Sequence, residues 1–111
     1  MLKGLSITAK PGQLVALVGA SGCGKSTVIA LVERFYDPSS GEVYIDGEKV
    51  TDLNIREYRQ RLALVSQEPT LYQGTIKENI MLGTDKLEIA DERIAAVCKE
   101  ANIYDFIMSL P

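Results

Sequence analysis

The segment GASGCGKST, residues 19–27, constrains this chain more than any other stretch of its sequence. It fits the pattern G-x-x-x-x-G-K-[ST] through Gly19, Gly24 and Lys25, with Ser26 at the last position. An aliphatic run, residues 13–18, precedes it, and apolar residues at helical spacing follow it. A buried strand, a glycine-rich turn and the start of a helix in that order are typical of a phosphate-binding loop. The segment therefore predicts an α/β fold built around such a loop.

The residue types of the segment suit phosphate binding. Glycines at positions 19, 22 and 24 allow successive backbone N–H groups to face one anion, and the helix N-terminus adds positive potential there. Lys25 would reach the outer phosphates, Ser26 would offer a hydroxyl to magnesium, and Thr27 would hydrogen-bond an inner phosphate. We expect the whole segment to contact nucleotide: Gly19, Ala20, Ser21, Gly22, Cys23, Gly24, Lys25, Ser26 and Thr27. The alternative is a glycine-rich turn that binds nothing.

The two cysteines predict different environments. Cys23 lies inside the loop beside Lys25 and a helix N-terminus, which favours a reactive thiolate, although a small filler residue of ordinary reactivity is an equal alternative. Cys98 lies on an apolar helical stripe and is expected in the core. The two are far apart in sequence and form no metal-ligand or disulfide framework.

Composition restricts the partners of the chain. Its 111 residues fit one small domain or part of one, and a net charge of −3 gives no basic field for nucleic acid. No apolar run approaches the roughly 20 residues that span a bilayer, so we expect no transmembrane segment in this chain. The first ten residues lack a continuous apolar region, which argues against a secretory signal.

Hydrophobic periodicity predicts alternating strands and helices. We expect a half-buried strand at 5–9, buried strands at 13–18 and 62–65, and a β-hairpin turning at Asp46-Gly47. A helix from 28 to 35 should end before Asp37-Pro38. A further helix is expected at 55–62, with Asp52 as its cap. Another should begin at a capping box of Thr75 and Glu78 and end at Gly83. Two more are expected at 94–101 and at 103–110.

Two residues are candidates for the metal and water chemistry that nucleotide hydrolysis needs. Asp46 follows an apolar run, but it is already explained as a hairpin turn, so we reject it as a metal-binding or catalytic aspartate. Gln67 follows the expected strand at 62–65, where its carbonyl could bind magnesium and its amide could donate to water. Residue chemistry alone leaves open that Gln67 is an ordinary glutamine at a strand end.

Three segments in order resemble a known family: GASGCGKST, then ERFYDPSSGEVYIDG, then LALVSQEPTLYQGTIKENIMLG. Together they resemble the nucleotide-binding domain of ATP-binding cassette (ABC) exporters, in the multidrug-resistance, P-glycoprotein-like branch. The resemblance covers the N-terminal part of that domain. It implies a partial RecA-like P-loop NTPase core with phosphate loop, β-hairpin and Q-loop at residues 1–74. An antiparallel β-subdomain would contain the hairpin, and residues 75–111 would begin an α-helical subdomain.

The resemblance also implies roles for individual residues. Lys25 and Gln67 would be the catalytic residues, Gln67 being the Q-loop glutamine, and Ser26 and Gln67 would bind Mg²⁺ beside ATP. The segment from Glu68 to Gly74 would contact the transmembrane domain of the same transporter. A second nucleotide-binding domain would complete a composite ATP site. The domain would lie on the cytoplasmic side of a membrane as part of a full-length transporter.

Other motifs of that family are not recognisable in these 111 residues. We find no LSGGQ signature, no Walker B strand with its Asp and catalytic Glu, and no switch histidine, because the sequence contains no histidine. We therefore expect the fragment alone to be inactive, while its full-length parent would be an ATPase. Two alternatives remain: a non-catalytic interaction or regulatory fragment that retains the P-loop fold, and another P-loop enzyme such as a kinase or GTPase.

Overall fold

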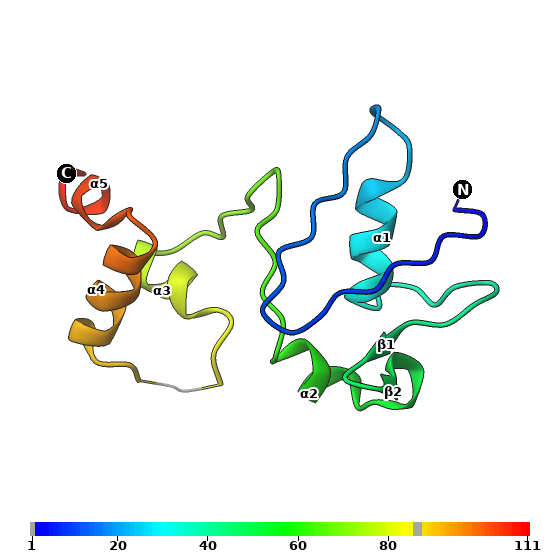
Figure 1. Cartoon of the computed structure of the whole chain (residues 1–111). Helices are drawn as coiled ribbons and strands as arrows, with labels where there is room; N and C mark the ends of the chain where they lie inside the picture. The colour runs from blue at the N-terminus through cyan, green and yellow to red at the C-terminus, as the bar shows by residue number, and fades with distance from the viewer. Residues whose placement is uncertain (1, 86–87) are drawn as a thin grey trace. The chain divides into compact units, whose positions relative to one another are not determined.

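The computed structural model describes residues 2–85 and 88–111, and the chain divides into two compact units (Figure 1). The first unit is Met1–Val65 and the second is Ser66–Pro111. The first contains α1, the hairpin β1–β2, the 3₁₀ turn η1 and α2, and the second contains α3, α4 and α5.

Helix α1, Lys25–Val32, begins directly after the glycine-rich segment. It ends three residues earlier than the periodicity predicts, because Arg34 adopts a left-handed conformation with φ 56°. The amide of Phe35 bonds the carbonyl of Ala30 at 2.9 Å, and that of Arg34 bonds Leu31 at 3.1 Å. These two bonds form a Schellman motif, so the helix ends at this motif and not at the Asp37-Pro38 pair. Phe35, expected on the core stripe, is consequently 60% exposed.

The predicted hairpin is confirmed, with strands shorter than expected. Strands β1, Tyr44–Ile45, and β2, Glu48–Lys49, pair antiparallel, with Tyr44 opposite Lys49. The turn residues Asp46 and Gly47 have φ of 51° and 82°. Positive φ at both central positions is the signature of the type I′ turn, whose twist matches that of the strands it joins.

The helix after the hairpin has a different cap from the one expected. Asp52 lies within the 3₁₀ turn η1, Val50–Asp52, and α2, Ile55–Arg59, is capped by Asn54. The Asn54 Oδ1 accepts from the amides of Arg56 at 3.0 Å and Glu57 at 3.3 Å. Asp52 is therefore wrong as the cap, because the chain inserts a 3₁₀ turn between it and the helix.

The three expected strands at 5–9, 13–18 and 62–65 are not formed. The side chains of Leu14, Val18 and Val65 are 96%, 92% and 96% exposed, which contradicts the predicted burial. Parallel strands need neighbours on each side to satisfy their backbone groups and helices over their faces. Among the described residues, β1 and β2 are the only paired strands, so these apolar segments run as irregular extended chain.

The second unit has the helices that the sequence predicts. Helix α3, Ile76–Met81, carries the predicted capping box, with Gly83 just beyond its cap residue Leu82. Helices α4, Asp91–Glu100, and α5, Tyr104–Met108, follow and contact each other. Cys98 is buried on α4, as expected. No helix in residues 2–85 and 88–111 combines the length and hydropathy of a membrane span.

Candidate nucleotide-binding site

The glycines of residues 19–27 occupy positions where other residues would be strained or would clash. Gly22 and Gly24 have φ of 77° and 99°, which L-amino acids with side chains rarely adopt. At Gly19 an added Cβ would lie 2.6 Å from the Cys23 sulfur. The amide of Cys23 bonds the carbonyl of Ala20 at 3.3 Å and closes a turn. The loop therefore has its curved shape because of the glycine spacing noted in the sequence.

The ammonium group of Lys25 is held by the loop itself. Its Nζ donates to the carbonyl oxygens of Gly19 at 2.7 Å and Ala20 at 2.8 Å, and lies 3.5 Å from the Cys23 sulfur. An ammonium group has three donors, and these contacts occupy all three. The cation is thus held against the loop that the sequence predicts to bind phosphate.

The N-cap residue of α1 offers no side-chain acceptor to the amides of the first turn. That residue is Gly24, which has no side chain, and no acidic residue lies in the first turn. The N–H groups of a first helical turn have no partner within the helix. They combine with the helix dipole to favour an anion, and no carboxylate competes for that place. Ser26 is exposed and Thr27 partly exposed in this turn.

This geometry fits the nucleotide that the sequence predicts. Main-chain donors at a helix N-terminus and one lysine ammonium suit the phosphate groups of ATP. The exposed hydroxyl of Ser26 is an oxygen donor of the kind that Mg²⁺ prefers. Among the described residues, no group of three Cys, Asp or Glu side chains could hold a metal by itself, so a magnesium ion would depend on phosphate oxygens as well.

The far end of α1 is anchored by side chains from α2. The Tyr58 hydroxyl donates to the carbonyl of Val32, and Arg59 donates to the carbonyls of Glu33 at 3.1 Å and Arg34 at 2.8 Å. The burial of Tyr58, with the nearby charge of Glu33, raises the pKa of its hydroxyl. Tyr58 lies in the helix expected at 55–62, but the sequence gives no signal for this anchoring, because it joins residues about 26 positions apart.

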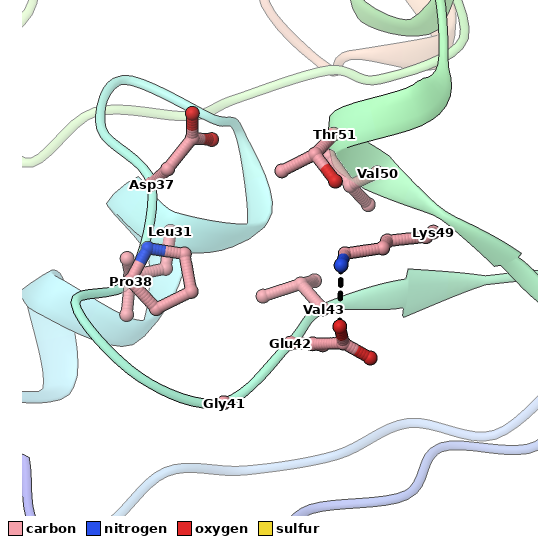
Figure 2. A pocket seen from close by; sticks show the side chains of 9 residues that line it. All are labelled: Leu31, Asp37, Pro38, Gly41, Glu42, Val43, Lys49, Val50 and Thr51. Carbon is pink, nitrogen blue, oxygen red and sulfur yellow. Dashed lines mark hydrogen bonds and ion pairs between the residues drawn. The ribbon is translucent and has the colours of Figure 1, made fainter.

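A cavity of about 150 Å³ lies beside the hairpin (Figure 2). Lys49 and Glu42 both line it and form an ion pair with each other, and Tyr44 also donates to Glu42. These contacts lower the pKa of Glu42, through Lys49 first, and raise those of Lys49 and Tyr44. The cavity is below the roughly 300 Å³ typical of small-molecule sites and shares no residue with the loop.

The two residues considered for metal chemistry lie in different units. Asp46 is exposed in the hairpin turn of the first unit, which confirms the reason for rejecting it. Gln67 is exposed in the second unit, in an irregular segment rather than at the end of a strand. The structure thus places residues 19–24 in one loop and residues 25–27 directly after it in the first turn of α1, while the role of Gln67 stays a prediction.

Comparisons with known proteins agree with the loop geometry. Residues 2–110 match the sequence profile of the family described as ABC transporter. The chain is 68% identical to the ABC multidrug transporter MDR2 of Trichophyton equinum, 64% to mdr1 of Aspergillus fumigatus and 63% to atrD of Emericella nidulans. All 111 residues are covered in each case.

The chain spans about 8% of the length of each of these relatives. The family match covers almost the whole chain and includes the complete phosphate loop, whose glycines and lysine have the geometry described above. The resemblance noted in the three sequence segments is confirmed. The chain belongs to the ABC transporter family, and through it to the P-loop NTPases.

Proposed function

We propose that this chain binds ATP and Mg²⁺ as part of the nucleotide-binding domain of a multidrug exporter. The full-length protein would couple ATP hydrolysis to transport across a membrane. The observation that carries the proposal is the loop of residues 19–27, in which Lys25 and the open N-terminus of α1 lie together. The similarity to fungal multidrug transporters supports the choice of exporter.

Each residue of the loop would have a separate task. Residues 19–24 would surround the phosphates with main-chain N–H groups, and Thr27 would hydrogen-bond an inner phosphate. Lys25 would exchange its bonds to the Gly19 and Ala20 carbonyls for bonds to outer phosphate oxygens. Ser26 and Gln67 would supply oxygen ligands to Mg²⁺, which neutralises phosphate charge when bound, and Gln67 would orient the attacking water.

Family membership supports the proposed architecture and partners. Residues 1–74 would form part of a RecA-like core and residues 75–111 the beginning of a helical subdomain. The segment from Glu68 to Gly74 would contact the transmembrane domain, and a second nucleotide-binding domain would complete the ATP site. The domain would lie on the cytoplasmic face of the membrane. We expect turnover from the full-length protein and none from these 111 residues alone.

Nucleotide binding by the 111-residue chain tests the proposal. Isothermal titration with ATP and magnesium should show binding that Lys25→Ala weakens roughly tenfold, because one charge-assisted contact to phosphate is lost. The matched control is Lys10→Ala, which removes an exposed lysine of the same unit outside the loop and should leave affinity unchanged. Equal affinities of the Lys25 and Lys10 variants would contradict the proposal.

Thiol labelling offers a second readout in the same samples. Cys23 is exposed in the loop, and Cys98 is buried on α4. ATP should slow modification of Cys23 by a maleimide, because the bound nucleotide would cover it. The slow labelling of Cys98 should be unaffected by ATP. Labelling of Cys23 at one rate with and without ATP would contradict nucleotide binding at this loop. If the titration then shows ATP binding, the nucleotide lies elsewhere, and if it shows none, the result favours a non-catalytic interaction fragment.

A further inference from the structure

The segment before α3 exposes two large apolar side chains next to each other. Leu71 is 82% exposed and Tyr72 is 63% exposed, and neither lies in a helix or strand. Isolated apolar residues are common on protein surfaces. These two differ because the backbone of Tyr72, directly next to Leu71, is held by side-chain hydrogen bonds.

Asn79 of α3 fixes that backbone. Its Oδ1 accepts from the amide of Tyr72 at 2.8 Å, and its Nδ2 donates to the carbonyl of Tyr72 at 3.0 Å. The same Nδ2 donates to the carbonyl of Thr75 at 2.9 Å. The side-chain amide of Asn79 therefore uses its oxygen acceptor and both of its N–H donors to bond the main chain of Tyr72 and Thr75. Bonding both the N–H and the C=O of Tyr72 imitates the pairing that a neighbouring strand would give.

The start of α3 also has contacts that do not involve Asn79. The carboxylate of Glu78 accepts from the amide of Thr75 at 2.6 Å and from its hydroxyl at 3.0 Å. Gly74 has φ of 147°, and a Cβ there would lie 2.7 Å from the Glu78 carboxylate. An ion pair between Lys77 and Asp91 ties α3 to α4. The helix that carries Asn79 is thus anchored at its N-terminus and along its surface.

We propose that Asn79 is a positioning residue that fixes Leu71 and Tyr72 in the orientation in which they contact the transmembrane domain. This inference rests on the proposed function, in which the segment from Glu68 to Gly74 makes that contact. It adds a residue outside the segment and a means of holding it. Without Asn79, Tyr72 would lose its only hydrogen-bond partner recorded within residues 2–85 and 88–111, and the two apolar side chains would sample many arrangements.

The first measurement uses hydrogen exchange in the full-length transporter that carries this chain. Amide hydrogen exchange should show protection of Tyr72 in the unsubstituted chain, and Asn79→Ala should speed its exchange roughly tenfold. Asn79→Asp retains the acceptor for the Tyr72 amide but loses both donors, so it should keep part of that protection. Lys77→Arg is the matched control on the same helix, because it keeps a cation for the ion pair with Asp91, and it should leave exchange of the Tyr72 amide unchanged. An unprotected Tyr72 amide in the unsubstituted chain would overturn the inference.

The second measurement uses the full-length transporter that carries this chain. Photoreactive p-benzoylphenylalanine at Leu71 should cross-link to the transmembrane domain, and Asn79→Ala should lower that yield roughly fivefold to tenfold, with a smaller loss in Asn79→Asp. The KM for ATP should stay within about twofold, because Asn79 is outside residues 19–27. If a variant unfolded α3, the amides of residues 78–82 would also exchange faster. Their exchange rates therefore separate unfolding of α3 from mispositioning of Leu71 and Tyr72.

The outcomes distinguish the inference from the function on which it rests. Unchanged cross-linking in both Asn79 variants, with the parent cross-linking to the transmembrane domain, would overturn the inference alone. Cross-links of the parent protein that fall outside the transmembrane domain would overturn the proposed contact, and with it the positioning role. Absence of Lys25-dependent ATP binding would overturn the proposed nucleotide function, while the exchange and cross-linking results would still decide the role of Asn79.

Discussion

At the scale of single residues, the hydrogen bonds that Lys25 already makes determine how much it can contribute to phosphate binding. Its ammonium donates to two loop carbonyls, and a phosphate would have to replace them. The binding energy of the lysine is therefore a difference between two sets of hydrogen bonds rather than the strength of one set. An arginine would not be equivalent, because its planar group presents donors in a different geometry.

Glu78 provides a prediction on pH at the same scale. Hydrogen bonds from the backbone and hydroxyl of Thr75 lower the pKa of Glu78 below its ordinary value of 4.5. A lowered folded pKa means that the capping box contributes fully above about pH 4.5 and loses that contribution as the pH falls through the folded pKa. Chemical shifts of residues 75–81 should report weakening of α3 as the pH falls below about 4.5.

Glu78→Gln supplies the control for that titration. The amide keeps an oxygen for the Thr75 donors but carries no charge, so α3 should be weaker at neutral pH and insensitive to acid. A parent chain whose α3 shifts do not change over this pH range would show that the carboxylate does not stabilise the helix start.

At the scale of elements, the parts that form are those whose stabilising contacts are close in sequence. The capping box of α3 joins residues three apart, and the hairpin turn places β1 and β2 in register. The Schellman motif that ends α1 has a counterpart at α4, where Asn102 has φ of 56° and Ile103 bonds the carbonyl of Cys98 at 3.0 Å. Asparagine tolerates this conformation better than most residues, which explains its place there.

Gly47 allows the hairpin to be tested as an element. Its φ of 82° is unfavourable for residues with a Cβ, although the surrounding space is open. Gly47→Ala should therefore destabilise the hairpin by about 1–2 kcal/mol through backbone strain alone. Cross-strand nuclear Overhauser contacts between Tyr44 and Lys49 would measure the loss. Gly83→Ala is the control, since Gly83 also has open space but no positive φ, and an equal effect of both changes would refute the assignment of strain.

At the scale of the whole molecule, the chain leaves much apolar surface in water. Its accessible area is 9990 Å², whereas two separate folded units of these sizes would together expose roughly 7,000 Å². Val50, Tyr58 and Cys98 are the buried hydrophobic residues among those described. So small a core offers little to offset the conformational entropy lost on folding.

This exposure predicts that the 111-residue chain is marginally stable and self-associates. The apolar segments at 13–18 and 62–65 have unpaired backbone groups, which makes them suited to pairing with other chains. Sedimentation velocity should show species larger than a monomer, and calorimetry should show no cooperative transition. The double variant Val18→Asp and Val65→Asp should reduce association, because charge opposes pairing. A soluble monomer with a sharp thermal transition would contradict the prediction.

The sequence by itself determined the features that depend on neighbours along the chain. The glycine spacing of residues 19–27 set the shape of the loop, and Asp46-Gly47 set the hairpin turn. Thr75 and Glu78 set the start of α3, and three ordered segments identified the family. These features were predictable because each depends on local backbone geometry or on contacts a few residues apart.

The tertiary structure decided whatever depends on residues that are distant in sequence. The expected strands at 13–18 and 62–65 lack paired neighbours among the described residues, and a strand cannot supply its own hydrogen-bond partners. The hydrogen bonds by which Tyr58 and Arg59 anchor α1 join residues about 26 positions apart, and no sequence pattern predicts them. Apolar periodicity shows that a segment can be buried, whereas burial itself requires other parts of the chain to cover that segment.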